Sequence, residues 1–311
     1  MSELSSIKVA VLMCSYNGEQ YLIEQLDSIK KQSIQHIDIW VSDDGSSDST
    51  CEILRSYQKE WNKGLFEIKT GPQKGFAANF MSLICDLDII ADYYAFSDQD
   101  DIWEVEKLSR ALNNLGKNDN NKPALYCSRT KLIAQCGKDL KHTSPLFSKK
   151  PSFANAIVQS LAGGNTMVIN NKARELVCKA GAQNIISHDW WLYMLVSGAD
   201  GDIFYDSIPS VKYRQHDNNE IGTNLTWNAR LNRIKMVLNG RFCDWNDTNT
   251  IALHKNRHLL TECNQRTLDT FMNARRSSGI KQMYLIIKSD VYRQTIIGNI
   301  ALYTAALFNR L

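Results

Sequence analysis

An acidic cluster at residues 96–103, Phe-Ser-Asp-Gln-Asp-Asp-Ile-Trp, has the clearest chemical potential in the sequence. Its carboxylates, Asp98, Asp100 and Asp101, repel one another, and a fold tolerates them when a cation lies among them. Hard divalent cations bind carboxylate oxygens and keep open positions for phosphate oxygens. The alternative is a solvated acidic turn that begins the next helix, where aspartate is favourable. Because an apolar run precedes the cluster and Trp103 follows it, we favour a metal site.

A second polar cluster, Ser-Asp-Asp-Gly-Ser, occupies residues 42–46. Adjacent carboxylates such as Asp43 and Asp44 can accept hydrogen bonds from a nucleobase imide and from ribose hydroxyls. The alternative is an Asx turn that caps the following helix.

The elements that must position these clusters follow from the spacing of apolar residues, which predicts alternating strands and helices. Strands are expected at residues 7–13, 37–41, 65–70 and 93–97, and helices at residues 22–29, from a capping box of Ser49 and Glu52 toward Trp61, at 75–87 and at 104–115. This alternation indicates an α/β fold with a mostly parallel central sheet and flanking helices. Ligands bind such sheets beyond the carboxyl ends of the strands, where the clusters at 14–17, 42–46 and 98–101 stand.

The composition is that of an ordinary globular protein, with 43% apolar and 22% charged residues among 311. The net charge of +3 hides an uneven distribution. Residues 225–311 hold 13 Lys and Arg against 5 Asp and Glu, a net +8, and residues 1–224 hold the remaining 23 against 28, a net −5. This division predicts chemistry in the front part and attachment to an anionic surface by the tail.

Several patterns favour a cytoplasmic protein. The eight cysteines are scattered without a Cys-x-x-Cys pair, as expected of reduced thiols. Residues 1–8 lack the pattern of a signal peptide, and the apolar run at 296–308 is shorter than the roughly 20 residues that span a bilayer. The absence of Gly-x-Gly-x-x-Gly and of a P-loop motif argues against dehydrogenases and P-loop NTPases. We expect no nucleic acid among the partners.

Residues 9–18, Val-Ala-Val-Leu-Met-Cys-Ser-Tyr-Asn-Gly, together with the Asp-Asp-Gly-Ser turn and the Asp-Gln-Asp-Asp segment, resemble glycosyltransferase family two. The resemblance covers about the first 220 residues in order. It implies a Rossmann-like GT-A domain at residues 1–224, a nucleotide-sugar donor, an acceptor glycan that is free or lipid-linked, and Mn²⁺ or Mg²⁺. The Gln-x-x-Arg-Trp signature of processive members is absent, which implies transfer of one sugar per encounter.

The resemblance also implies roles for single residues. Asp44 would contact the nucleobase, Asp98 would approach the ribose, and Asp100 would ligate the metal that bridges the diphosphate. The residues that would flank the base are Ser15, Tyr16, Asn17 and Glu19.

The family's general base corresponds here to Asp189, which would remove the proton of the acceptor hydroxyl as that oxygen attacks the anomeric carbon. Such a single displacement would invert the anomeric configuration. The sequence departs from the family's common acidic pair, because His188 stands where an acidic residue often does. The alternative is that Asp189 only caps the following helix.

A later segment, Tyr-Arg-Gln-His at residues 213–216, offers His216 as a further metal ligand and Arg214 as a partner of the diphosphate. An imidazole suits Mn²⁺ better than Mg²⁺; the alternative for His216 is an exposed loop histidine. Lys74 precedes a helix whose N-terminus could face phosphate, although a lone lysine is usually a solvated charge.

The acceptor is expected near Leu-Ala-Gly-Gly-Asn-Thr at residues 161–166, because glycines let a sugar approach the backbone closely. We assign acceptor binding to Gly164, Asn165 and Trp190. A tight turn without a ligand is the alternative reading of the glycines.

The tail at residues 225–311 mixes apolar residues with lysine and arginine at helical spacing. Basic amphipathic helices suit an anionic membrane surface. The alternatives are a helical cap on the catalytic domain and a homodimer contact.

The main hypothesis is an inverting glycosyltransferase of bacterial surface polysaccharide synthesis, such as O-antigen or capsule. The Asp-Gln-Asp-Asp-Ile-Trp and Tyr-Arg-Gln-His segments resemble bacterial rhamnosyltransferases, which implies dTDP-rhamnose as donor. A UDP-hexose donor, a nucleotidyltransferase, and a non-catalytic scaffold that binds sugar nucleotides are the alternatives.

Overall fold

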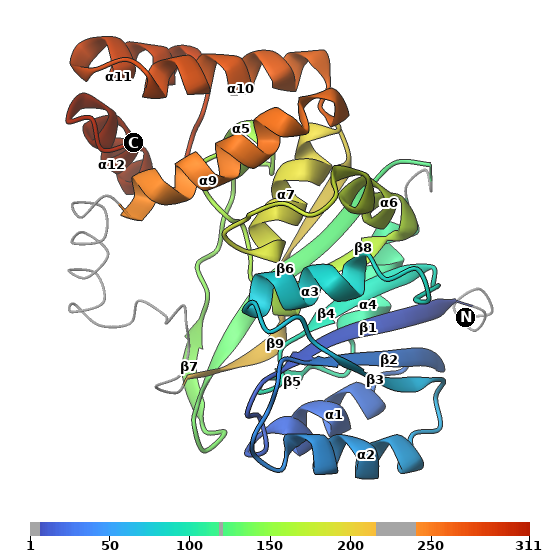
Figure 1. Cartoon of the computed structure of the whole chain (residues 1–311). Coiled ribbons are helices and arrows are strands. Elements are labelled where there is room, and N and C mark those ends of the chain that lie inside the picture. Colours follow the sequence, from blue (N-terminus) through green and yellow to red (C-terminus); the bar gives the residue numbers. More distant parts are fainter. Residues whose placement is uncertain (1–6, 118–120, 216–240) are drawn as a thin grey trace.

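The computed structural model describes residues 7–117, 121–215 and 241–311. Within these ranges, nine strands form one sheet in the order β3-β2-β1-β4-β8-β6-β9-β5, with β7 paired to β6 (Figure 1). The strands are β1 Lys8–Ser15, β2 His36–Asp43, β3 Phe66–Thr70, β4 Tyr93–Ser97, β5 Ile102–Trp103, β6 Ala124–Ala134, β7 Asp139–Thr143, β8 Val168–Asn170 and β9 Asp202–Gln215.

The first half of the sheet is parallel, as the sequence predicts. The strands β1, β2, β3 and β4 occupy neighbouring positions with parallel pairing. The intervening helices are α1 Leu22–Lys30, α2 Thr50–Glu60 and α3 Phe76–Ile84, and α4 Lys107–Leu115 follows β5. The predicted capping box is wrong in detail, because Ser49 is the N-cap of α2 but makes no side-chain capping hydrogen bond.

The second half is mixed, which the expectation of a mostly parallel sheet did not include. The short strand β8 lies between β4 and β6 and pairs antiparallel with both, so that Ile169 faces Tyr94 on one side and Leu125 on the other. The long strands β6 and β9 then pair in parallel. A three-residue strand between two longer ones reverses the direction of pairing without a helical crossover.

Helices cover both faces of the sheet (Figure 1). Along β1, Val9, Val11 and Met13 belong to the apolar core shared with α1, α2 and α4. The alternating residues Ala10 and Leu12 belong to the core on the other face, with α3, α6 Asn171–Ala180 and α7 His188–Gly198. This burial of both faces explains the unbroken apolar run 9–13 in β1.

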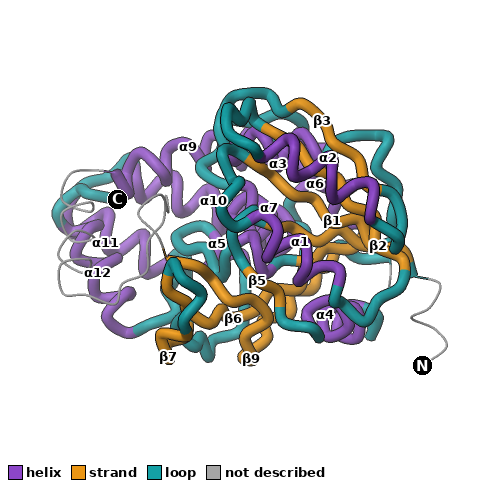
Figure 2. Tube along the Cα trace, turned by 90° about the horizontal axis from the view of Figure 1, so that it is seen from below, coloured by secondary structure: helices purple, strands orange, loops and turns teal. Residues whose placement is uncertain are grey.

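The tail is helical, as predicted, in the part that the structure describes. It contains α9 Arg241–Lys255, α10 Glu262–Arg275, α11 Gly279–Lys288 and α12 Ile296–Leu307, and it lies on the side away from α1 and α2 (Figures 1 and 2). Leu253 and Phe271 share the apolar core of the α3 and α7 face. The predicted boundary at residue 224 lies outside the described residues. None of the described helices is long and apolar enough to cross a bilayer.

Candidate active site

The ends of β1, β2 and β4 lie side by side and bring their polar residues to one edge of the sheet. Ser15 is paired with Asp43, and Met13 with Ser97. The N–H of Asp44 donates to the Ser15 carbonyl oxygen at 2.9 Å, one residue past the strands. The three polar clusters are therefore neighbours, as the sequence predicts.

Asp43 and Asp44 have different surroundings although they are adjacent. Asp43 is buried and accepts hydrogen bonds from the hydroxyls of Ser15 at 2.9 Å and Ser46 at 2.5 Å. Burial opposes its ionisation, but the hydrogen bonds from Ser46 and Ser15 hold the pKa of Asp43 below its ordinary value. Asp44 is half-buried and accepts from the Gln73 N–H at 2.6 Å. Asp43 thus stabilises the turn at residues 43–46, and Asp44 is the more accessible carboxylate of the two.

Asn17 and Glu19 hold the loop after β1 to the loop after β2. Asn17, which has a left-handed backbone (φ 48°), accepts the Ser47 N–H at 2.8 Å through Oδ1, and Glu19 accepts the Ser49 N–H at 2.9 Å. Their place beside a nucleobase stays a prediction, and these contacts add a role in fixing both loops. Tyr16 is 59% exposed, so its ring is accessible to a base.

The last carboxylate of the acidic cluster points into the protein. Asp101 is completely buried and accepts hydrogen bonds from Asn165 Nδ2 at 2.5 Å and from the Arg214 N–H at 3.2 Å. Burial and a neighbouring carboxylate raise the pKa of Asp101 to about 7, against these hydrogen bonds. Lys107, also buried, donates to the Asn165 carbonyl oxygen at 2.6 Å. Asp101 and Lys107 are thus buried polar side chains that support the rest of the acidic cluster from the protein interior.

Asp98 lies where the acidic cluster meets the start of α7. Burial and the charges of Asp101, Asp100 and Asp189, in that order, raise the pKa of Asp98 well above its ordinary value. The carboxylate of Asp189, in the first turn of α7, is therefore near that of Asp98. The structure brings the predicted base to the predicted nucleotide site.

His188 is a buried neighbour of the predicted base. Its ring stacks on Phe80 with centroids 3.9 Å apart, and neither ring nitrogen has a hydrogen-bond partner in the described residues. Burial lowers the pKa of His188 to about 4, against the opposing charge of Asp189. A β-carbon added at Gly164 would lie 2.2 Å from His188 Nε2, so the glycine allows the imidazole its place. At neutral pH His188 is uncharged.

The other predicted acceptor residues are buried too. Asn165 supports the acidic cluster through Asp101, and Trp190 donates its indole N–H to the Ala156 carbonyl oxygen at 2.6 Å. Such burial favours supporting roles for Gly164, Asn165 and Trp190 over direct contact with an acceptor. Their acceptor-binding role stays a prediction.

Arg214 joins the end of β9 to the acidic cluster. Its guanidinium is 2% exposed, forms an ion pair with Glu24 of α1, and donates through Nε to the Asp100 carbonyl oxygen at 2.9 Å. It also lies 4.5 Å from the centroid of the Tyr21 ring. These contacts position the loop that carries Asp100, and contact with a diphosphate stays a prediction. Lys74 is exposed before α3, on the loop after β3.

The fit of the acidic cluster to a metal rests on charge. No group of three or more His, Cys, Asp or Glu side chains is arranged to hold an ion within residues 7–117, 121–215 and 241–311. The predicted ligand His216 lies outside these ranges. The carboxylates that raise the pKa of Asp98 repel one another, and a divalent cation relieves such repulsion. Asp100, in this repulsive cluster, therefore fits a cation whose coordination other ligands complete.

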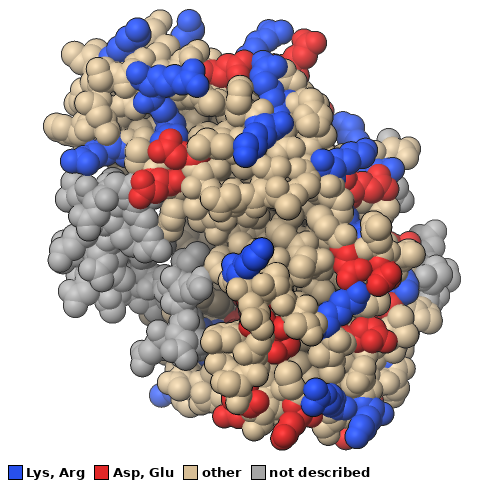
Figure 3. All heavy atoms as spheres, viewed as in Figure 1, with Lys and Arg blue, Asp and Glu red and all other residues tan. Residues whose placement is uncertain are grey.

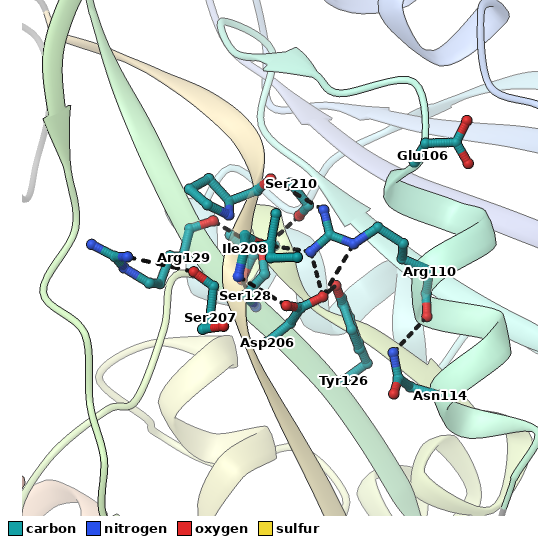
Figure 4. A network of polar contacts seen from close by, with 12 residues as sticks. Glu106, Arg110, Asn114, Tyr126, Ser128, Arg129, Asp206, Ser207, Ile208 and Ser210 are labelled. Atoms are coloured by element: carbon teal, nitrogen blue, oxygen red, sulfur yellow. Dashed lines mark hydrogen bonds and ion pairs between the residues drawn. The ribbon is translucent and has the colours of Figure 1, made fainter.

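A network on the flank of the sheet holds β9, the strand that carries Arg214 next to its end (Figure 4). Between paired residues, β9 advances 5 positions from Asp206 to 211 while β6 advances 2 from Ser128 to 130, so β9 bulges by 3 residues. Arg110 of α4 forms an ion pair with Asp206 and donates to the Ile208 carbonyl oxygen at 2.7 Å, inside the bulge. Tyr126 donates its hydroxyl to Asp206 at 2.7 Å.

A cavity of about 470 Å³ adjoins this network, and none of the predicted site residues lines it. Its lining residues are Asn114, Tyr126, Phe147, Ser148, Lys149, Lys150, Pro151, Ile203, Phe204, Tyr205, Asp206 and Ser207.

Three residues of the site received no role from the sequence. Gln99 accepts a hydrogen bond from the backbone N–H of Tyr16, and Lys107 donates one to the Asn165 carbonyl oxygen. Glu24 forms an ion pair with Arg214. Gln99 is the second residue of the Asp-Gln-Asp-Asp motif, and this position was a signal in the sequence that could have identified it. Lys107 and Glu24 are ordinary helix residues whose partners are distant in sequence.

Comparison with known proteins places this geometry in a family. Residues 10–159 match the family model described as Glycosyl transferase family 2. The chain is 32% identical over 237 residues to dTDP-rhamnosyl transferase RfbG of Shigella flexneri, covering 73% of this chain and 79% of that protein. It is 27% identical over 234 residues to the uncharacterized glycosyltransferase RT0329 of Rickettsia typhi, covering 73% and 68%.

Solved structures agree on the fold. TarS 1–349 of S. aureus in complex with UDP-GlcNAc superposes with a TM-score of 0.57 at 14% identity, covering 97% of this chain and 82% of that one. The mannosyltransferase PcManGT of Pyrobaculum calidifontis, in complex with GDP-Man and Mn²⁺, gives 0.52 at 14% identity, covering 98% and 86%. The GT-A fold expected from the sequence is confirmed.

Proposed function

The chain belongs to glycosyltransferase family 2, and from this premise we propose that it transfers a single rhamnose from dTDP-rhamnose to a hydroxyl of an acceptor glycan. The donor proposal rests on the 32% identity to a relative named for dTDP-rhamnosyl transfer. A UDP-hexose is the competing donor, because neighbours of the same fold bind other sugar nucleotides.

The observation that carries the proposal is that Asp189 lies close enough to Asp98 for its charge to help raise the pKa of Asp98. Asp98 directly follows β4, at the edge of the sheet where the nucleotide is expected. Asp189 lies in the first turn of α7, and its charge helps to raise the pKa of Asp98. A donor bound along the strand ends would thus have its sugar beside a carboxylate from another element.

The nucleotide is proposed to lie between the ends of β1, β2 and β4. Burial and the charges of Asp98 and Asp44 raise the pKa of the Cys14 thiol, so Cys14 lies between the two acidic clusters. The base would stack near the exposed Tyr16 and bond to Asp44, and the ribose would approach Asp98. A nucleoside has polar groups at both ends, so it could contact both acidic clusters.

Mn²⁺ or Mg²⁺ is proposed at Asp100, next to Asp98, with His216 as a further ligand. When bound, such an ion neutralises the charge that develops on the diphosphate leaving group. Arg214 fixes the loop of Asp100 through its hydrogen bond to the Asp100 carbonyl oxygen.

In the proposed reaction Asp189 acts as the general base. Its carboxylate takes the proton of the acceptor hydroxyl while that oxygen forms a bond to the anomeric carbon. The bond from the anomeric carbon to the diphosphate oxygen breaks, the nucleoside diphosphate leaves, and the configuration inverts. The buried, uncharged His188 keeps the start of α7 packed against Phe80 without adding a charge beside the base. We place this step in bacterial surface polysaccharide synthesis, in the cytoplasm.

A thermal-shift panel of dTDP, UDP, GDP and CMP, each with and without Mn²⁺, tests the proposal. A ligand that binds only the folded state raises the melting temperature, and we expect a metal-dependent rise with dTDP that Asp100→Ala abolishes and Asp139→Ala, an exposed control on β7, retains. A rise with UDP alone would replace the donor. No rise with any nucleotide would refute the donor site.

A further inference from the structure

The outer face of α12 carries no charge. The helix packs inward through Leu302, Ala305 and Ala306. Ile296, Ile297 and Ile300 are 79%, 81% and 59% exposed, and Phe308 just after the helix is 67% exposed. The exposed residues from 296 to 308 are Ile296, Ile297, Ile300, Ala301, Thr304, Leu307 and Phe308. At 100° per residue they span an arc of about 140°, so they form one continuous apolar face.

The neighbouring helix α11 adds a second apolar stripe with a basic edge. Ile280, Tyr284 and Ile287 are exposed at positions i, i+4 and i+7, which places them on one side of the helix. Lys281 and Lys288 are also exposed, each one residue after an isoleucine of the stripe. We call the exposed residues of α11 and α12 the tail face.

Exposure of this kind is concentrated in the tail face. Of the 17 large apolar side chains exposed in the described residues, 8 lie between 280 and 308. Single exposed apolar residues need no explanation, but a contiguous group marks a surface that binds something apolar.

The surroundings of the tail face are positively charged. Residues 276–311 contain 5 Lys and Arg and 1 Asp, a net +4. Lys149 of the front part of the chain lies near the start of α12, with its Nζ 5.0 Å from the centroid of the Tyr292 ring. Lys and Arg also gather over the helices of the tail in the space-filling view (Figure 3).

We propose that the tail face binds the surface of a bilayer that contains anionic lipids. The isoleucines of α12 enter the boundary between headgroups and acyl chains, and Lys281 and Lys288 lie at the level of the lipid phosphates. This proposal goes beyond the glycosyl transfer proposed above and does not depend on its donor.

Charge also argues against a second copy of the chain as the occupant. A two-fold dimer brings the same patch of both subunits together. Both patches would carry Lys281 and Lys288, and the tail face has no acidic residue to pair with them. An anionic lipid surface instead complements them.

The test is co-sedimentation of the full chain with vesicles of phosphatidylcholine alone or mixed with phosphatidylglycerol. We expect binding to the mixed vesicles only. The double variant Ile297→Glu, Ile300→Glu should weaken it at least about tenfold, and Lys281→Glu with Lys288→Glu about tenfold. Leu87→Glu, at an 84% exposed position after α3, is the matched control and should bind as the native chain does.

Other outcomes would overturn the proposal. One is no binding to mixed vesicles by a chain that light scattering shows to be a dimer, and that Ile297→Glu with Ile300→Glu makes a monomer. Equal binding to both kinds of vesicle, unchanged in the variants, is another. Unchanged melting temperatures of the variants establish that they fold. Vesicle binding needs no sugar nucleotide, so its failure is distinct from failure of the donor site.

Discussion

The side-chain amide of Gln99 pairs with the backbone of Tyr16 as a second strand would. Gln99 Nε2 donates to the Tyr16 carbonyl oxygen at 2.9 Å, and its Oε1 accepts the Tyr16 N–H at 2.8 Å. The pair joins the loop after β1 to the loop after β4. It therefore fixes the distance between the proposed base-binding and metal-binding parts of the site.

Gln99→Leu removes both hydrogen bonds while keeping the approximate size of the side chain. We expect the dissociation constant of the donor nucleotide, measured by calorimetry, to rise about tenfold, because two backbone groups lose their partners. Gly18→Ala should act in the same direction, since its β-carbon would lie 2.2 Å from Gln99 Oε1. Native affinity in both variants would contradict the positioning role.

Asp189→Asn keeps the shape of the proposed base but removes its ability to accept a proton. We expect kcat to fall about 10²- to 10⁴-fold, with the thermal shift by the nucleotide retained. Asp88→Asn, at an exposed carboxylate of the loop after α3, is the control and should keep native kcat. A chain whose turnover survives in Asp189→Asn uses another base.

The buried imidazole of His188 predicts a loss of stability in acid. Its pKa is about 4 in the folded chain and near 6.5 when unfolded, so the unfolded state binds the proton first as pH falls. The contribution of His188 to stability should be full above pH 6.5 and decrease toward pH 4, by about 3 kcal/mol.

Denaturant unfolding at pH 4.5 and pH 7 measures this decrease. His188→Gln should make the difference between the two pH values smaller, because glutamine does not titrate. His142→Gln, at an exposed position of β7, should leave it as in the native chain. Equal pH dependence in all three proteins would exclude His188 as the cause.

The contacts of Arg110 with Asp206 and Ile208 in the β9 bulge should stabilise the folded chain. Arg110→Met leaves the partly buried Asp206 without its ion pair, and we expect a loss of about 2 kcal/mol in the free energy of unfolding. Arg257→Met breaks an ion pair with Asp269 whose partners are 41% and 43% exposed, and should cost less than about 1 kcal/mol. Similar losses of unfolding free energy in the two variants would show that burial does not strengthen the ion pair of Arg110 with Asp206.

Patterns local in sequence predicted much of the fold. The strand β4 has the expected limits, Tyr93–Ser97, and both ends of β1 and β2 lie within two residues of those expected. Periodicity identifies such elements because their apolar residues are buried in a regular order. The antiparallel strand β8 and the bulge of β9 depend on pairing between distant segments, which periodicity does not report.

The same limit applies to the site. The acidic cluster was recognisable, and the family resemblance implied roles for Asp98 and Asp100, but no pattern in the sequence separated the buried Asp101 from them. Asp101 is buried because Asn165 and the backbone of Arg214 reach it from positions 64 and 113 residues away. Asp98 gains its position beside Asp189 from the packing of α7. Such partners are set by the tertiary fold.

The position of the acidic cluster between β4 and β5 affects the order in which parts of the chain fold. Only residues 98–101 separate β4 from β5, although β8, β6 and β9 lie between these strands in the sheet. The sheet must therefore curl so that its edge strand β5 returns to a position near β4. The acidic cluster forms the short connection between these two strands. Its final conformation requires Trp103 to pair with Val211 of β9. The donor site should consequently be among the last features to form during folding, and a bound nucleotide should report that both halves of the sheet have joined.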